Sequence, residues 1–118
     1  MQIQLLKSKV HRAAVTDANV NYEGSITIDR ALMDEVDLRE HERVLCGNLA
    51  NGERFETYAI AGESGSGAII LNVASAHLGK ARDRLTIMSY ATVEEAAAAD
   101  WQPKVIVLGD DNVIIATR

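Results

Sequence analysis

Residues 43–61 read RVLCGNLANGERFETYAIA, and this stretch decides the fold class. Two strand-like runs, 43–49 and 54–61, flank the dipeptide Asn51-Gly52. Asparagine and glycine both tolerate a positive φ, which the tight turn between two antiparallel strands requires. The stretch therefore predicts a β-hairpin.

Strand-like patterns also dominate the rest of the chain. Residues 1–15 mix aliphatic and charged side chains, with the β-branched Ile3, Val10 and Val15 among them, which predicts one long or bent strand. Shorter runs predict strands at 26–28, 68–72, 85–90, 105–108 and 113–116. About seven short strands with small helical connectors indicate a mainly β fold, a closed β-barrel whose closure removes exposed strand edges.

The predicted helices are few and short. Asp29 can cap a turn and a half of helix, and residues 74–80 have room for one or two turns. The segment 92–95, Thr-Val-Glu-Glu, fits a capping box, and Pro103 would end the helix that follows it.

Length and composition bound the class of protein. The 118 residues fit one domain, with 47% hydrophobic and 25% charged side chains. A net charge of −5 and only 4% aromatic residues argue against a nucleic-acid partner, which needs basic side chains and stacking platforms. No apolar run approaches the ~20 residues of a membrane span, and the first residues lack a secretory layout. The single cysteine, Cys46, favours a reducing compartment, so we expect a cytoplasmic protein.

Conventional catalytic motifs are missing from the sequence. It has no Gly-x-Ser-x-Gly elbow, no P-loop and no dinucleotide fingerprint. His11, His41 and His77 lie far apart and lack the spacing of metal ligands, and Cys46 is typical of a small buried side chain. The residues therefore predict no metal site.

The dipeptide Gly24-Ser25 offers a different chemistry. In a strained turn, the Ser25 hydroxyl can attack the Gly24 carbonyl and convert the amide to an ester, because glycine leaves that carbonyl open and permits unusual φ and ψ. β-Elimination then cuts the chain, and hydrolysis of the dehydroalanine leaves a pyruvoyl group. This electron sink would supply covalent catalysis. Taken alone, Gly-Ser is far more often an ordinary turn.

Four blocks of sequence together point to one family. They are Lys9-Val-His-Arg12, Tyr22-Glu-Gly-Ser25, NGERFETYAI at 51–60, and Leu71-Asn72. With these blocks in this order, over about residues 5–103, the chain resembles aspartate 1-decarboxylase, the small pyruvoyl enzyme that makes β-alanine for pantothenate.

That resemblance implies a six-stranded double-ψ β-barrel with short peripheral helices, assembled as a homotetramer. It also implies autocatalytic cleavage between Gly24 and Ser25, by an N-to-O acyl shift, into a β chain of residues 1–24 and an α chain of residues 25–118. The covalent pyruvoyl group from Ser25 would form a Schiff base with L-aspartate, and β-alanine and CO2 would be released. Whether a maturation factor assists the cleavage stays open.

The resemblance also implies roles for further residues. Tyr58 would be the proton donor, since a phenol with a pKa of about 10 stays protonated at neutral pH. Thr57 and Asn72 would assist processing by orienting or polarising the Gly24 carbonyl. The implied substrate-binding residues are Lys9, His11, Arg54, Thr57, Tyr22, Ala74 and Ser75.

Spacing along the predicted strands bears on how L-aspartate, with its two carboxylates, could be held. Lys9 and His11 are two positions apart and leave the same face of a strand. Arg54 and Tyr58 also share a face, about 13 Å apart, so one can hold a carboxylate while the other reaches the reacting carbon. Thr57 has the opposite parity and needs a bend or bulge to join them. Which cation meets which carboxylate stays open.

Two positions depart from the family pattern. Val73 stands where the family usually has glycine, and a valine there narrows the pocket or alters substrate preference if the position needs a positive φ. The usual Gly-Asp turn is here Arg82-Asp83. Two alternatives therefore stay open: a non-catalytic β-barrel binding module that keeps Ser25 intact, and a related pyruvoyl decarboxylase with an altered amino-acid preference.

Overall fold

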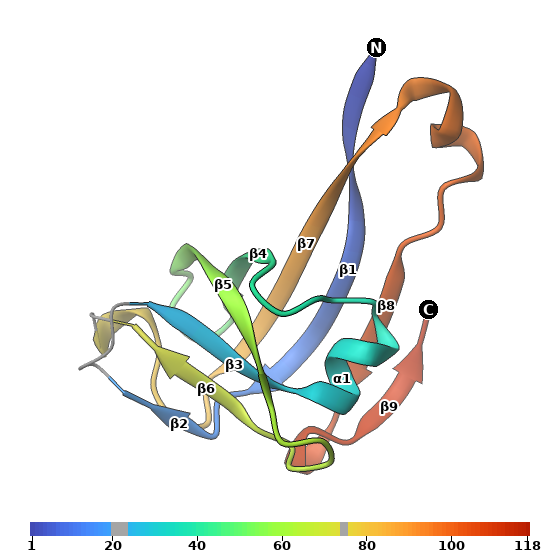
Figure 1. Cartoon of the computed structure of the whole chain (residues 1–118). Helices are drawn as coiled ribbons and strands as arrows, with labels where there is room; N and C mark the ends of the chain where they lie inside the picture. Colours follow the sequence, from blue (N-terminus) through green and yellow to red (C-terminus); the bar gives the residue numbers. More distant parts are fainter. Residues whose placement is uncertain (20–23, 74–75) are drawn as a thin grey trace.

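The computed structural model describes residues 1–19, 24–73 and 76–118. Within them it has one α-helix and three short 3-10 helices: α1 (Arg30–Glu35), η1 (Ala76–Leu78), η2 (Glu95–Asp100) and η3 (Asp110–Asn112). The strands are β1 (Gln2–Ala14), β2 (Asp17–Ala18), β3 (Ser25–Asp29), β4 (Arg43–Asn48), β5 (Arg54–Gly62), β6 (Ile69–Asn72), β7 (Arg84–Glu94), β8 (Lys104–Leu108) and β9 (Ile114–Thr117). The prediction of a mainly β fold with few short helices is confirmed (Figure 1).

The strands pair in the order β2-β6-β3-β5-β4-β7-β1-β8-β9, with β2·β6, β3·β5 and β1·β8 parallel. Only Val15 and Thr16 separate β1 from β2, and both continue the pairing: Arg82 N donates to Val15 O at 2.7 Å, and Thr16 N to Ile69 O at 2.8 Å. The pairing from β2 to β1 therefore begins and ends on one stretch of chain. The closed barrel and its six-strand count stay predictions. The double-ψ crossing stays a prediction.

The core lies on one face of this curved sheet. Side chains alternate along each strand, so Val10, Cys46 and Ile87, each at most 1% exposed, face the core from β1, β4 and β7. The neighbouring positions Lys9, Gly47 and Thr86 lie on the opposite face of the sheet, which we call the outer face. A solvent-accessible outer face is what lets an antiparallel region carry polar groups.

The predicted hairpin and the predicted helix cap are both confirmed. β4 and β5 pair without interruption from Gly47↔Arg54 to Arg43↔Tyr58, and Gly52 in the connecting turn has φ 76°. Asp29 precedes α1, and its carboxylate accepts a hydrogen bond from Ala31 N at 2.8 Å. Both features were predictable because the residues that form them are local in sequence.

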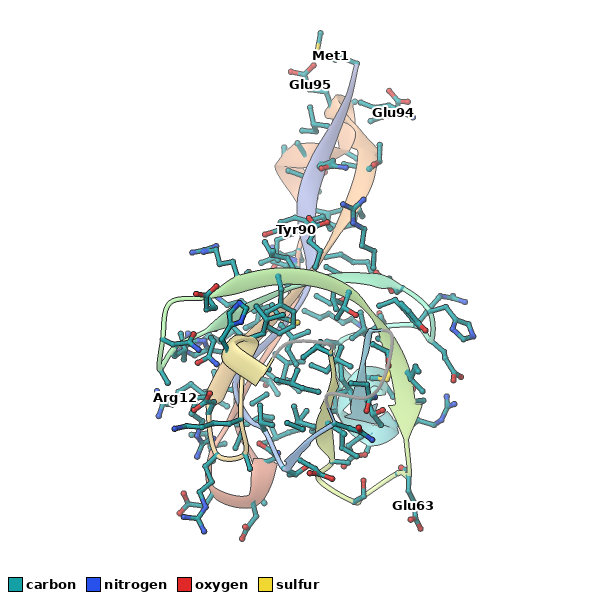
Figure 2. The ribbon with its side chains drawn as sticks, turned by 90° about the vertical axis from the view of Figure 1, so that its left-hand side faces the viewer. Met1, Arg12, Glu63, Tyr90, Glu94 and Glu95 are labelled. Carbon is teal, nitrogen blue, oxygen red and sulfur yellow. The ribbon has the colours of Figure 1, made fainter. Side chains whose placement is uncertain are left out.

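The predicted capping box at 92–95 is wrong. Thr92 lies within β7 and pairs with Gln4 of β1, and Glu95 N donates to Met1 O at 2.9 Å, so η2 begins only at Glu95 and has no side-chain cap. Backbone pairing with the first residues of β1 replaces the local cap. The result is a two-stranded arm that projects from the body of the molecule, with Met1, Glu94 and Glu95 at its tip (Figures 1 and 2).

β1 is the long, bent strand that the pattern predicts. Its pairing with β7 shifts register between Leu6 and Ser8 and again between His11 and Ala13, and Arg12 at the second shift has φ 66°. A bulge of this kind bends a strand and increases its twist. The bend lets one strand serve both the projecting arm and the body.

Candidate functional site

Ser25 and Asn72 form a buried polar pair at the position where β3 begins and β6 ends. They stand opposite each other in the antiparallel ladder, at 4% and 9% exposure. Asn72 Nδ2 donates to Ser25 Oγ at 3.1 Å and to Thr27 Oγ1 at 3.1 Å. Because Asn72 donates to it, the Ser25 oxygen is oriented while its own proton stays available.

Gly24, directly before this serine, has φ 126°, in the region that favours glycine. An added Cβ would meet no atom within 4 Å, so space does not dictate glycine here; the backbone conformation does. The peptide link that the sequence marks for cleavage therefore follows an unusual backbone conformation and precedes an oriented hydroxyl.

Tyr58 and Thr57 leave opposite faces of β5. Ile26 pairs with Ala59 in the parallel β3·β5 ladder and both side chains are fully buried, so Ser25 and Tyr58, one position earlier on each strand, leave the outer face. Tyr58 is 43% exposed. The β4·β5 ladder has no bulge, so the bend that Thr57 would need to join Arg54 and Tyr58 does not occur there.

The outer face of β5, β4, β7 and β1 carries a cavity of about 540 Å³ that Lys9 and Arg54 line. Four residues form one row across these strands, Arg54↔Gly47, Gly47↔Thr86 and Thr86↔His11. No ion pair of the described residues involves Lys9 or Arg54, and Glu53 is the carboxylate among the lining residues. Two cations with free charge suit an anionic ligand.

His11 adds a titratable group to the same row. Its Nδ1 lies 3.1 Å from Thr86 Oγ1. Partial burial lowers the pKa of His11 below its usual value, and the positive charges of Lys9, Arg12 and Arg118 lower it further. The lowered pKa favours the neutral imidazole at neutral pH, and protonation at lower pH would add a positive charge beside the cavity.

The structure thus brings the predicted residues into two groups. Ser25 and Asn72 meet where β3 begins and β6 ends, next to Tyr58 in register. Lys9 and Arg54 line the cavity, which Ser25 does not, and His11 contacts Thr86 of the cavity lining. Tyr22, Ala74 and Ser75 lie outside the described residues. Sequence reasoning missed Thr86 and Gly47, because only the order β5-β4-β7-β1 places them between Arg54 and His11.

The two departures from the family pattern have structural answers. Val73 does not have a positive φ, so a valine is accommodated here without backbone strain. Its side chain packs into the hydrophobic core and is 6% exposed. Arg82 has φ 78°, and its backbone N–H donates to Val15. An arginine takes the left-handed conformation at this turn that glycine would take more easily.

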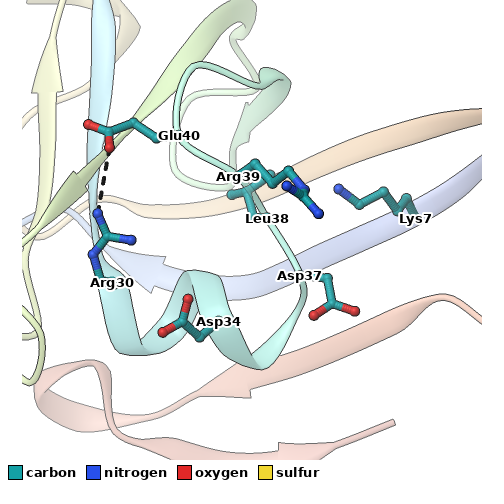
Figure 3. Close-up of a pocket in the computed structure, with 7 residues that line it drawn as sticks. All are labelled: Lys7, Arg30, Asp34, Asp37, Leu38, Arg39 and Glu40. Atoms are coloured by element: carbon teal, nitrogen blue, oxygen red, sulfur yellow. Dashed lines mark ion pairs between the residues drawn. The ribbon is translucent and has the colours of Figure 1, made fainter.

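A second, larger cavity of about 850 Å³ lies beside α1, lined by Lys7, Arg30 and Arg39 together with acidic residues (Figure 3). Its charges are largely paired: Lys7 Nζ is 2.7 Å from Glu42 Oε1, and Arg30 Nη2 is 3.5 Å from Glu40 Oε2. Mutual neutralisation leaves little net field for a charged ligand. The cavity of about 540 Å³ on the outer face, lined by Lys9 and Arg54 without an ion pair among the described residues, is therefore the better candidate for binding an anionic substrate.

Two features of the described residues bear on the class of site. No group of three or more His, Cys, Asp or Glu side chains in this part of the chain could hold a metal ion. None of its helices combines the length and apolar character that crossing a membrane would take. The candidate site thus consists of a buried hydroxyl, its amide donor and a cationic cavity on a β-sheet.

These features define a small β protein with an oriented serine and an anion-binding face, and comparison with known proteins gives its family. The family model for aspartate decarboxylase matches residues 1–115. Aspartate 1-decarboxylase of Clostridium acetobutylicum is 51% identical over 114 residues, 97% of this chain and 90% of that protein. The enzyme of Syntrophobacter fumaroxidans is 52% identical over 112 residues, 95% of this chain and 90% of that protein. The chain therefore belongs to the aspartate decarboxylase family, and the resemblance read from its motifs is confirmed.

Proposed function

We propose that this protein converts L-aspartate to β-alanine and CO2, the step that supplies β-alanine for pantothenate biosynthesis, after cutting its own chain between Gly24 and Ser25. The observation that carries the proposal is the buried hydrogen bond from Asn72 Nδ2 to Ser25 Oγ beside a glycine with φ 126°. A binding module would have no need for this oriented hydroxyl. Family membership supports the same reaction.

The first step is the self-cleavage. Ser25 Oγ adds to the Gly24 carbonyl carbon, the proton passes to the Ser25 nitrogen, and the carbon–nitrogen bond breaks to leave an ester. Loss of the Ser25 α-proton expels the Gly24 carboxylate, and water then releases ammonia from the dehydroalanine to leave a pyruvoyl group. Asn72 orients the attacking oxygen. We also propose that Thr57 assists the cleavage by orienting or polarising the Gly24 carbonyl.

The residues around position 25 fit a pyruvoyl group. Asn72 Nδ2 is a donor, and the same amide that now donates to Ser25 Oγ would suit a carbonyl oxygen there. When present, the group supplies a ketone beside a carbonyl, which accepts the electron pair that decarboxylation releases. The chain then consists of residues 1–24 and 25–118.

The other residues bind the substrate and move a proton. Lys9 and Arg54 hold its carboxylates, with the guanidinium fork of Arg54 matched to two carboxylate oxygens. His11 assists them as a neutral donor. Tyr58 returns a proton to the α-carbon, since its hydroxyl leaves the same outer face as Ser25. Tyr22, Ala74 and Ser75 complete the proposed binding residues.

We further propose that the protein acts in the cytoplasm as a homotetramer. Tyr58, Tyr90 and Leu49 are 43%, 46% and 50% exposed, and they stand on or beside the outer face that carries the cavity. Large apolar side chains gathered next to a binding site are typical of a surface that another subunit covers.

The reaction is tested by measuring CO2 release from L-aspartate, L-glutamate and L-cysteine with the full-length, matured protein. We expect release from L-aspartate, at a rate that Tyr58→Phe lowers strongly without preventing chain cleavage. Absence of CO2 from all three amino acids in fully cleaved protein would remove the enzymatic function. A chain that stays uncleaved and releases no CO2 would favour the non-catalytic binding module. Release without any preference for L-aspartate would remove the substrate assignment alone.

A further inference from the structure

Gly47 stands in the interior of β4, where nothing about the fold requires a glycine. Its φ is outside the left-handed region, and an added Cβ would meet no atom within 4 Å. Glycine weakens a strand interior, and its presence there often marks a close approach by a ligand. The other glycine of a described strand, Gly62, differs, since a Cβ there would lie 3.0 Å from the Thr27 side chain.

The open space at Gly47 is part of the cavity on the outer face. Gly47 pairs with Arg54 on one side and with Thr86 on the other, and all three residues line the cavity of about 540 Å³. Two strand spacings separate Arg54 from Thr86, roughly 10 Å. The floor of the cavity is therefore bare backbone between the Arg54 guanidinium and the Thr86–His11 pair.

We propose that Gly47 sets the length of the acid that this cavity accepts, and that its missing side chain admits five-carbon as well as four-carbon dicarboxylates. The inference rests on the proposed function, because it takes Lys9 and Arg54 as the carboxylate-binding cations. A side chain at position 47 would project from the outer face into the cavity, between Arg54 and Thr86. It would exclude the longer acid first, since the longer acid needs more of the floor.

Binding measured without turnover tests the inference. Dissociation constants for succinate and glutarate are determined by calorimetry on the full-length matured protein and on Gly47→Ala, Gly47→Val and Gly47→Leu. We expect the unsubstituted protein to bind the two acids within about 5-fold of each other. One methylene in a tight site is worth about 10- to 200-fold, so Gly47→Val should weaken glutarate at least 10-fold more than succinate. Ala116→Val, which enlarges a side chain on β9 outside the cavity, should leave the ratio of the two dissociation constants unchanged.

The outcomes separate this inference from the proposed function. If no Gly47 variant changes the ratio of the dissociation constants for glutarate and succinate, while succinate binds and L-aspartate is still decarboxylated, the inference alone is overturned. Exclusion of glutarate by the unsubstituted protein would also overturn it. Failure of both acids to bind, together with no CO2 from L-aspartate, would overturn the proposed function and the inference with it. Circular dichroism of each variant confirms that the fold is retained.

Discussion

At the scale of single residues, the amide of Asn72 is the group that holds the Ser25 hydroxyl. It donates to Ser25 Oγ and to Thr27 Oγ1, each at 3.1 Å, from a position only 9% exposed. A donor fixed in a buried site orients its acceptor at no further cost when the reaction begins. The family resemblance implied that Asn72 assists the cleavage next to Ser25, but only the register of β3 with β6 shows how the two side chains meet.

Replacing Asn72 with alanine removes this donor. We expect Asn72→Ala to slow self-cleavage by about 100-fold, the scale of losing one preorganised donor, as followed by the fraction of cleaved chain over time on denaturing gels. Thr27→Val is the matched control, because it removes the second acceptor of the same amide and leaves Ser25 oriented. Equal cleavage rates in Asn72→Ala and the unsubstituted protein would contradict the orienting role.

Arg54 is the residue whose charge and shape can be separated by substitution. Arg54→Lys keeps the positive charge but loses the planar fork that pairs with two carboxylate oxygens. We expect the KM for L-aspartate to rise about 10-fold with a smaller change in kcat, since ground-state binding is what is lost. Steady-state kinetics measure both constants. An unchanged KM would show that Arg54 makes no paired contact with the substrate.

At the scale of elements, the predictions succeeded where structure is local and failed where a distant strand intervened. The hairpin at 43–61 and the Asp29 cap depend on residues close in sequence, and both are confirmed. The capping box at 92–95 failed because β1 supplies backbone partners that the local pattern does not reveal. The row from Arg54 through Gly47 and Thr86 to His11 needs the order of four strands, which no single segment encodes.

Asp29 connects three elements through one buried carboxylate. Oδ1 accepts hydrogen bonds from Ala31 N of α1 and from Gly65 N at 2.9 Å, and Oδ2 accepts one from Gly67 N at 2.8 Å. The carboxylate therefore fixes the glycine-rich segment 62–67, Gly-Glu-Ser-Gly-Ser-Gly, against the end of β3. This contact explains how the six-residue run at 62–67, flexible by composition, is ordered in the structure.

Removing this carboxylate takes away the acceptor of three backbone amides, those of Ala31, Gly65 and Gly67. We expect Asp29→Ala to destabilise the fold by about 3 kcal/mol and to lower its thermal midpoint by about 10 °C, as read by differential scanning calorimetry. Asp34→Ala is the control, since Asp34 lies on the exposed side of the same helix, where substitutions change stability by about 0.5 kcal/mol or less. Similar midpoints for the two variants would contradict the connecting role of Asp29.

At the scale of the whole molecule, one curved sheet presents its reactive groups on its outer face. The oriented Ser25 lies where β3 begins and β6 ends, and the cations Lys9 and Arg54 line the cavity over β5, β4, β7 and β1. The arm of β1 and β7 extends the molecule, whose dimensions are 43 × 27 × 24 Å. The side chains that supply charge are thus positioned by strand pairing, whereas the electron sink that we propose would be formed from the chain itself at position 25.

The central claim is therefore that one peptide bond of this chain rearranges and breaks. The intact mass of the purified, denatured full-length protein measures this directly. We predict two chains, residues 1–24 and a longer one that begins at the former Ser25 with a carbonyl in place of an amine, whereas Ser25→Ala stays a single chain of 118 residues. A preparation that releases CO2 from L-aspartate and yet consists only of the continuous chain would contradict the account.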